Sequence, residues 1–229
     1  MCHKSCIIFG ARSLATEEIK GKSVLELGSR DVNGSLRSII NAWAPEHYVG
    51  VDIVKGPGVD VVCDAEGIAE RFGQESFDIV ISTEMVEHVR NWREAISNIK
   101  RVCKPGGTVL LTTRSRGYAY HGYPFDFWRY EVQDMKEIFA DFEILTVERD
   151  PEAPGVFLKA RRPKKFLEAD LSNYKLFSIL SRRKVVGVTN EDLGGLSFFA
   201  LTVKEKMKNA IFSTAKKLIK RAYPDLYYG

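Results

Sequence analysis

The apolar residues of the chain follow two patterns that alternate from residue 23 to about residue 145. Short continuous apolar runs predict buried strands at 23–27, 47–53, 59–63, 77–82 and 108–113. Between these runs, apolar residues three or four positions apart predict helices at 36–42, 65–72 and 91–102. Repeated alternation of strand and helix is typical of βαβ units, so the sequence predicts an α/β fold with a mostly parallel sheet.

The pattern changes after residue 140. Segments 141–148 and 156–161 are joined by a short turn containing Pro and Gly, which predicts an antiparallel strand pair at the end of the sheet. Segments 184–188 and 196–203 predict a further strand pair.

Residues 204–222 predict a basic amphipathic helix. Its apolar face comprises Met207, Ile211, Ala215, Leu218 and Ala222. We expect this face to pack on the domain. Contact with an anionic membrane surface or with a polyanion remains an alternative.

The composition is that of a globular protein, because 45% of the 229 residues are apolar and 28% are charged. It excludes wholesale disorder, collagen and coiled coil, and the length allows one large domain or one domain with an appendage. The net charge of +4 is unevenly distributed. Residues 1–150 contain 18 Lys and Arg against 23 Asp and Glu, whereas residues 151–229 contain 16 against 7. An acidic body with a basic end indicates a catalytic domain with a surface that meets an anionic partner.

The spacing of the four cysteines, Cys2, Cys6, Cys63 and Cys103, is not that of a disulfide framework. We therefore expect reduced thiols and a cytoplasmic protein, with peripheral membrane contact through 204–222 as the alternative. The first residues have no signal-peptide pattern, and the longest apolar run, 196–203, is too short to cross a bilayer. Although Cys2, His3 and Cys6 are close in sequence, no second ligand pair accompanies them. We therefore expect a frayed N-terminus and no metal site.

A Gly-containing turn connects the first strand to the first helix, from Glu26 to Gly34. Such a turn allows a ligand to approach the backbone closely and to face a helix N-terminus. The dinucleotide fingerprint is absent, because Arg30 occupies a position where it has glycine. This absence disfavours a pyrophosphate cofactor.

Two aspartates follow the next two strands. Asp52 lies 24 residues after Gly28, a spacing that suits hydrogen bonds to ribose hydroxyls. Asp64 precedes the helix that begins at Ala65, so it suits either an adenine amino group or the capping of that helix.

Taken together, these motifs resemble the class I S-adenosylmethionine-dependent methyltransferases. The resemblance spans about residues 20–160 and rests on segments 24–28, 50–52, 64–65, 77–88 and 99–107. The most specific are the Glu87-His88 pair after the fourth strand and Lys104-Pro105-Gly106-Gly107 after the next helix. The first loop departs from the family pattern, because it is longer and keeps only Gly28 and Gly34 of the usual glycines.

The resemblance implies a Rossmann-like, doubly wound, mostly parallel seven-stranded sheet with an antiparallel last strand. We expect the methyltransferase domain at 1–162 and a basic C-terminal extension at 163–229, packed on the same domain or appended to it. The implied cofactor is S-adenosyl-L-methionine, in contact with nine residues: Glu26, Gly28, Ser29, Gly34, Asp52, Ile53, Asp64, Ala65 and Thr83. Of these, Glu26, Gly28 and Ser29 would line its methionine end, Asp52 its ribose, Ile53, Asp64 and Ala65 its adenine, and Thr83 its sulfonium.

Residues 114–130 are rich in aromatic and polar side chains and begin at the end of a strand, which is typical of a lid or substrate wall. We expect acceptor contacts from Arg114, Tyr123, Trp128, Arg129 and Tyr130. The candidate general bases are His88, His121 and Asp126. For His88 a structural role is the alternative, and the whole segment could instead be an aromatic brace over the cofactor.

We therefore expect an enzyme that methylates a small molecule or a glycan, at a hydroxyl group. One alternative is a catalytically idle methyltransferase-fold subunit that binds a partner. Another is nucleic-acid methylation, which the sequence disfavours because residues 83–86 read Thr-Glu-Met-Val instead of Asn/Asp-Pro-Pro-aromatic.

Overall fold

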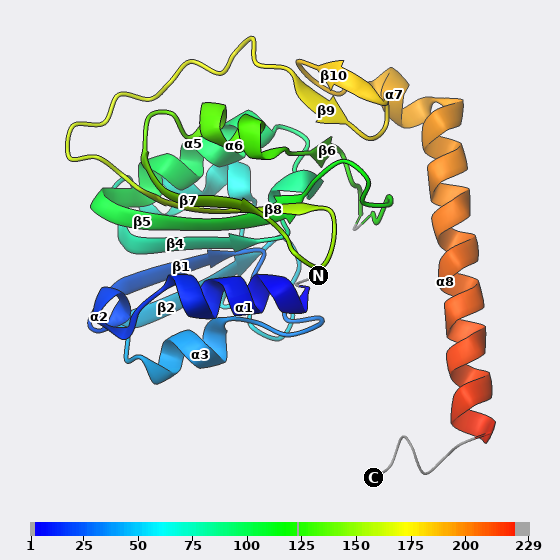
Figure 1. The fold of residues 1–229 in the computed structure, drawn as a ribbon, viewed down its shortest axis with the longest axis horizontal. Helices are drawn as coiled ribbons and strands as arrows, with labels where there is room; N and C mark the ends of the chain where they lie inside the picture. The colour runs from blue at the N-terminus through cyan, green and yellow to red at the C-terminus, as the bar shows by residue number, and fades with distance from the viewer. Residues whose placement is uncertain (1–2, 123, 223–229) are drawn as a thin grey trace.

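The computed structural model describes residues 3–122 and 124–222 of the chain. Its centre is a seven-stranded sheet with the order β3-β2-β1-β4-β5-β8-β7 (Figure 1). The strands are β1 Ser23–Leu27, β2 His47–Asp52, β3 Val61–Val62, β4 Phe77–Thr83, β5 Cys103–Arg114, β7 Glu143–Arg149 and β8 Gly155–Arg161. Strands β1 to β5 pair in parallel, whereas β8 runs antiparallel to both β5 and β7. The predicted α/β class and seven-stranded sheet are confirmed.

Helices cover both faces of this sheet (Figure 1). One face carries α1 Lys4–Ser13, α2 Thr16–Ile19 and α3 Arg37–Ala42, and the other carries α4 Ile68–Phe72, α5 Trp92–Val102 and α6 Val132–Ile138. Each face has its own apolar cluster. On β1, for example, Val24 belongs to one cluster and Leu25 to the other, as expected because alternate residues of a strand point to opposite faces.

Helix α5 illustrates how the sequence pattern becomes packing. Its residues Trp92, Ile96, Ile99 and Val102 are spaced three or four apart and are completely buried in the same cluster. At the end of the helix, the buried ammonium group of Lys100 pairs with Asp141 at 2.7 Å. This pair fixes α5 to the segment that leads into β7.

The prediction of a frayed N-terminus is wrong for the residues that the structure describes. Residues 4–13 form α1, whose Cys6 and Phe9 are buried against the sheet. The ring of Phe9 stacks on Phe157 of β8 with centroids 4.8 Å apart. Cys2 lies outside the described residues.

The second predicted strand pair is also wrong. A small sheet joins β6 Trp128–Arg129, β9 Leu176–Ser178 and β10 Arg183–Val185, in the order β10-β9-β6. The partner of β10 is therefore β9, and residues 196–203 instead begin a long helix, α8 Leu196–Ala222. In this helix Phe198 and Leu201, three residues apart, pack on the core, whereas Phe199 is 66% exposed.

Short helical turns complete the chain: η1 Ala65–Gly67, η2 Val86–His88 and α7 Asn190–Gly194. Beyond its first turns α8 leaves the body of the molecule, as Figure 1 shows. Met207 and Ile211 are 60% and 68% exposed, so this part of the predicted apolar face is not packed on the domain. Within the described residues no helix is both long enough and apolar enough to span a membrane.

Candidate functional site

The carboxyl ends of the parallel strands meet at one edge of the sheet, where open α/β folds bind ligands. On β1, Glu26 is buried near this edge and accepts a hydrogen bond of 2.8 Å from the hydroxyl of Tyr48 on β2. Burial raises the pKa of Glu26 to about 7, although the hydrogen bond from Tyr48 acts in the opposite direction. A buried carboxyl with a raised pKa is a group that a cationic ligand would ionise.

The loop after β1 turns sharply at Gly28, whose φ is +74°. The backbone N–H groups of Gly28 and Ser29 both donate to the carbonyl oxygen of Val51, at 2.9 and 3.0 Å. A Cβ atom on Gly28 would lie 2.7 Å from Cβ of Met85, so a larger residue does not fit here without movement. The hydroxyl of Ser29 is buried and has no hydrogen-bond partner among the described residues.

The same loop is tied to the segment after β2. The N–H of Asp31 donates to the carbonyl oxygen of Pro57, and the Asp31 carboxylate accepts from the N–H of Gly34, each at 2.9 Å. Gly34 has a φ of +113°, a backbone conformation that glycine adopts more easily than other residues. The lengthened loop is therefore a folded turn that hydrogen bonds hold in place.

Asp52 ends β2 and Ile53 follows it, and their contacts with ribose and adenine stay predictions. The carboxylate of Asp52 accepts hydrogen bonds from the N–H groups of Arg30 at 3.3 Å and Val54 at 3.0 Å. The side chain of Ile53 is 49% exposed, which is unusual for an isoleucine next to a buried strand. An exposed apolar side chain beside a fixed carboxylate suits a ribose-bearing aromatic base.

Of the two roles predicted for Asp64, the structure shows the capping of a helix. Its carboxylate accepts from the N–H of Glu66 at 2.9 Å and caps the short helix η1, which begins at the buried Ala65. Contact with an adenine group stays a prediction. Thr83 is buried at the end of β4, at the edge of the sheet where Gly28 follows β1.

A buried ionic network lies directly behind this edge. Glu84 follows β4 with a φ of +54°, a strained conformation for a residue other than glycine. Its carboxylate pairs with Arg114 at the end of β5, and Arg114 also pairs with Asp150 at 3.0 Å. Asp150 in turn accepts from the hydroxyl of Ser5 in α1 at 2.9 Å. Arg114 is thus completely buried, and it presents no surface to an acceptor.

Residues 115–127, which we call the β5–β6 loop, bring the three candidate bases together. His121 Nδ1 lies 2.8 Å from Asp126 Oδ2, and the rings of His121 and His88 meet edge to face with centroids 4.8 Å apart. The two terminal guanidinium nitrogens of Arg129 donate hydrogen bonds of 2.5 and 2.7 Å to the carboxylate of Asp126. Asp126 and Arg129 therefore form a buried pair that shapes the loop.

The charges in this cluster shift the pKa values of its members. Burial alone would lower the pKa of His121, but the carboxylates of Asp126 and Glu87 raise it to about 9. Burial also lowers the pKa of His88, and here the nearby carboxylates do not compensate. His88 is therefore the better proton acceptor of the two at neutral pH.

Of the other predicted acceptor contacts, two lie inside the core. Trp128 is completely buried and its indole N–H donates to the carbonyl oxygen of Val89 at 2.9 Å. Tyr130 is also completely buried, and its hydroxyl donates to the carbonyl oxygen of Val86 at 3.3 Å. Both residues therefore have a structural role in the core. Tyr123, another predicted acceptor contact, lies outside the described residues.

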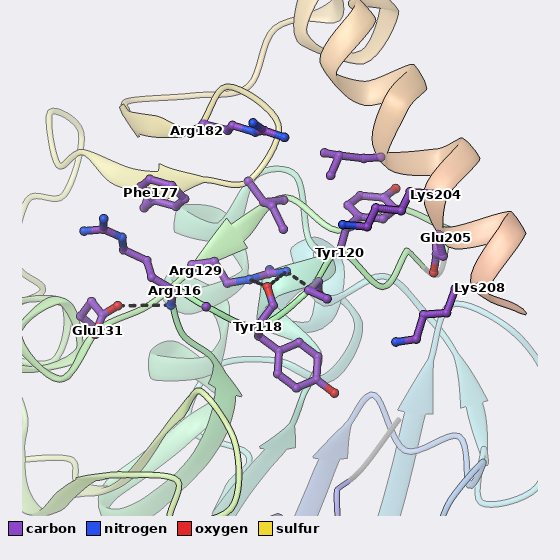
Figure 2. A pocket seen from close by; sticks show the side chains of 14 residues that line it. Arg116, Tyr118, Tyr120, Arg129, Glu131, Phe177, Arg182, Lys204, Glu205 and Lys208 are labelled. Carbon is purple, nitrogen blue, oxygen red and sulfur yellow. Dashed lines mark hydrogen bonds between the residues drawn. The ribbon is translucent and has the colours of Figure 1, made fainter. Parts of the chain in front are cut away.

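A cavity of about 890 Å³ lies between the β5–β6 loop, the small sheet and α8 (Figure 2). Tyr118, Tyr120 and Arg129 line one side of it, and Phe177, Arg182, Lys204, Glu205 and Lys208 line the other. Only Arg129 of these residues was predicted as an acceptor contact. The residues on the second side of the cavity were not predicted. They belong to the C-terminal extension, where the basic composition was the sole sequence signal of a binding role.

Comparison with known proteins identifies what this arrangement resembles. A family model described as a methyltransferase domain matches residues 8–146. The ubiquinone biosynthesis O-methyltransferase of Rhizobium johnstonii is 30% identical over 124 residues, which cover 49% of this chain and 49% of that protein. The chain thus spans about half the length of this relative. Phosphoethanolamine N-methyltransferase 2 of Caenorhabditis elegans is 30% identical over 77 residues, 32% of this chain and 18% of that protein.

Solved structures share the fold at lower identity. The 1,6-didemethyltoxoflavin-N1-methyltransferase of Burkholderia thailandensis, with its bound ligand and S-adenosylhomocysteine, gives a TM-score of 0.55 at 13% identity. The match covers 69% of this chain and 78% of that one. An S-adenosylmethionine-dependent methyltransferase of Mesorhizobium loti gives 0.53 at 17% identity, covering 69% and 98%.

Proposed function

Because the chain belongs to the family of S-adenosylmethionine-dependent methyltransferases, we propose that it transfers the methyl group of this cofactor to a hydroxyl group of a small, negatively charged acceptor. The match of the family model over residues 8–146 carries the first half of this proposal. It also confirms the family and the cofactor that the sequence motifs predicted. The charge and size of the cavity beside the β5–β6 loop support the acceptor class.

The residues at the strand ends fit the cofactor. Ser29 supplies a buried hydroxyl without a partner among the described residues, and Ile53 supplies an exposed apolar surface. In our proposal Glu26, Gly28 and Ser29 line the methionine end, and Asp52 binds the ribose. Gly34 shapes the first loop, Ile53, Asp64 and Ala65 border the adenine, and Thr83 lies beside the sulfonium.

When bound, the cofactor supplies a methyl group attached to a positively charged sulfur. In the transfer a bond forms between the acceptor oxygen and the methyl carbon, the carbon–sulfur bond breaks, and its electron pair stays on sulfur. The hydroxyl proton must leave, and His88 is our candidate to accept it, because burial lowers its pKa and keeps the ring neutral. The main task of the protein is to align the acceptor oxygen with the methyl carbon, which can lower the barrier by about 7–11 kcal/mol.

The cavity favours an anionic acceptor. Five basic side chains line it. Arg129 is paired with Asp126, whereas Arg116, Arg182, Lys204 and Lys208 form no ion pair within the described residues. The two acidic residues at the cavity are Glu131, which accepts from the N–H of Arg116, and Glu205. Figure 2 shows the basic side chains approaching the cavity from both walls. A volume of about 890 Å³ suits a molecule of ordinary metabolite size.

Calorimetric titration of the full chain with S-adenosylmethionine and S-adenosylhomocysteine tests the cofactor half of the proposal. We expect micromolar binding that Asp52→Asn weakens at least tenfold. Asp170→Asn is the matched control, because Asp170 is exposed and lies in the C-terminal extension. Folded protein that binds neither compound would refute the proposed activity.

Transfer of a radiolabelled methyl group to paired acceptors tests the acceptor half. Each pair contains an anionic hydroxyl compound, such as a hydroxybenzoate or a sugar phosphate, and its neutral analogue. We expect the anionic member to be preferred, and Arg182→Ala or Lys204→Ala to raise its KM at least tenfold. Arg183→Ala should leave KM unchanged, because this exposed neighbour does not line the cavity.

Two results would contradict this half of the proposal. Equal use of neutral and anionic acceptors would show that the basic wall does not select the acceptor. Cofactor binding without transfer to any acceptor would favour the alternative of a catalytically idle subunit that binds a partner.

A further inference from the structure

Three potential metal ligands meet at the carboxyl end of β4. Glu87 and His88 belong to the short helix η2, and His121 comes from the β5–β6 loop. One ligand atom from each residue lies within 4.8 Å of the other two. Glu87 Oε1 is 3.9 Å from His88 Nε2 and 3.8 Å from His121 Nε2. The three side chains therefore converge on one point.

The outer contacts of both histidines leave these Nε2 atoms free to bind. His88 Nδ1 lies 2.6 Å from the carbonyl oxygen of Phe125, which can only accept, so Nδ1 carries the proton of the neutral ring. His121 Nδ1 lies 2.8 Å from the carboxylate of Asp126, an ion-pair distance without the geometry of a hydrogen bond. A backbone carbonyl or a carboxylate behind each imidazole is the usual outer shell of a metal-binding histidine.

The carboxylate of Glu87 supplies the second, independent observation. This side chain is completely buried, and its Oε2 accepts a hydrogen bond of 2.8 Å from the hydroxyl of Thr113. Its Oε1 has no hydrogen-bond partner among the described residues, and it points between the two histidines. A buried carboxylate oxygen without a donor requires a compensating positive charge.

We propose that Glu87 Oε1, His88 Nε2 and His121 Nε2 bind one divalent transition-metal ion. Two imidazole nitrogens and one carboxylate oxygen form a set that Zn²⁺ occupies in enzymes, with the remaining position open. Zinc bound at about 2.1 Å in tetrahedral geometry separates its ligand atoms by about 3.4 Å. The two Glu87–His distances of 3.8 and 3.9 Å are a few tenths of an ångström wider, and all three ligand atoms lie within 4.8 Å of one another, so binding requires the side chains to move closer together.

The position of this site gives the ion a role at the acceptor. Helix η2 follows the strand that ends at Thr83, and Tyr118, which lines the cavity, meets the ring of His121 edge to face at 4.9 Å. The ion would thus lie between the cofactor end of the sheet and the cavity. Its open position suits an acceptor oxygen, whose hydroxyl group ionises more readily beside a metal ion, so a bound ion would take over from His88 the task of promoting loss of the acceptor proton. This role rests on the proposed methyl transfer, whereas metal binding itself does not.

A proton is the competing occupant of the cluster. Protonated His121 between Asp126 and Glu87 would form a purely structural ion pair, and no metal would then bind. The two cases differ in measured metal content and in the effect of single substitutions.

The test uses the full chain, freed of any affinity tag and stripped with a chelator, and titrates it with Zn²⁺, Mn²⁺ and Mg²⁺ by calorimetry. We expect one Zn²⁺ per chain with micromolar or tighter affinity and weaker binding of Mg²⁺. Cobalt substitution should give the visible absorption of a low-symmetry Co²⁺ site. His121→Asn should weaken Zn²⁺ binding at least 100-fold, and Asp126→Asn about tenfold to 100-fold.

His47→Asn is the matched control, because His47 is an exposed histidine at the start of β2. It should leave Zn²⁺ binding unchanged. S-adenosylmethionine binding is measured on the same samples, so that loss of fold or of the proposed function is recognised separately. Absence of stoichiometric metal in protein that still binds the cofactor, or metal binding unaffected by His121→Asn, would overturn the inference.

Discussion

Tyr48 of β2 and Glu26 of β1 are connected by a hydrogen bond of 2.8 Å beneath the proposed cofactor site. Burial holds the pKa of Glu26 at about 7 in spite of this bond. The carboxyl group is therefore about half ionised near neutral pH, and a positive group nearby would increase the ionised fraction.

The affinity for S-adenosylmethionine should rise with pH between 6 and 8. Ionised Glu26 attracts the cationic cofactor, and a group with a pKa of about 7 is about one-tenth ionised at pH 6 and nine-tenths ionised at pH 8. Calorimetry across this range should show a gain of up to about tenfold, with release of a proton on binding. Glu26→Gln should remove the pH dependence, whereas Glu46→Gln at an exposed position should preserve it.

Gly28→Ala should impair cofactor binding as well as stability. An alanine at φ +74° costs about 1–2 kcal/mol, and its Cβ would also lie 2.7 Å from Cβ of Met85. We expect a loss of affinity for S-adenosylhomocysteine of at least tenfold in calorimetry. Gly21→Ala separates the two effects, because Gly21 has a similar φ of +66° with no atom within 4 Å of the added Cβ. Equal cofactor binding by both variants would contradict the crowding at Gly28.

Arg114→Ala should unfold the protein at much lower denaturant concentration. The substitution leaves the carboxylates of Glu84 and Asp150 buried without their shared cation, at a cost of about 3–5 kcal/mol. The exposed pair of Arg161 and Glu143 offers a control, since Arg161→Ala should cost no more than about 1 kcal/mol. Similar urea midpoints for the two variants would show that the buried network contributes little.

Phe198→Ala should loosen the β5–β6 loop. The ring of Phe198 in α8 lies 6.4 Å from that of Tyr120 and 6.0 Å from that of Phe125, so it connects the helix to the loop. Hydrogen exchange should be faster in the loop after this substitution. Phe199→Ala removes the same ring from the neighbouring exposed position and should leave exchange unchanged.

The sheet was predictable because its strands are continuous apolar runs buried on both faces. The first turns of α8 were not, since the run from Leu196 to Val203 fits a strand as well as a helix over so short a length. Only the contacts of Phe198 and Leu201 with the core decide in favour of the helix. Helix α1 was missed because its burial depends on Phe157, which is distant in sequence.

The strand-end residues of the candidate site were predictable for a topological reason: carboxyl ends of parallel strands share one edge. Contacts across the β5–β6 loop were not. Aromatic residues of segment 114–130 suggested acceptor contacts, yet Trp128 and Tyr130 are completely buried. The meeting of Glu87 with His121 depends on how the loop folds back over η2, for which the sequence offers no local signal.

The antiparallel direction of β8 has a consequence for how such a protein can diversify. Because β8 returns toward β5, the turn at 150–154 lies at the same edge as the ends of β4 and β5, where the carbonyl oxygen of Pro154 accepts from the N–H of Ser115. Gly117, which lines the cavity, lies against Pro154. An insertion or deletion in this hairpin would therefore remodel the cavity proposed for the acceptor while β1 and β2 stay untouched, so that acceptor choice could change without a change at the proposed cofactor site.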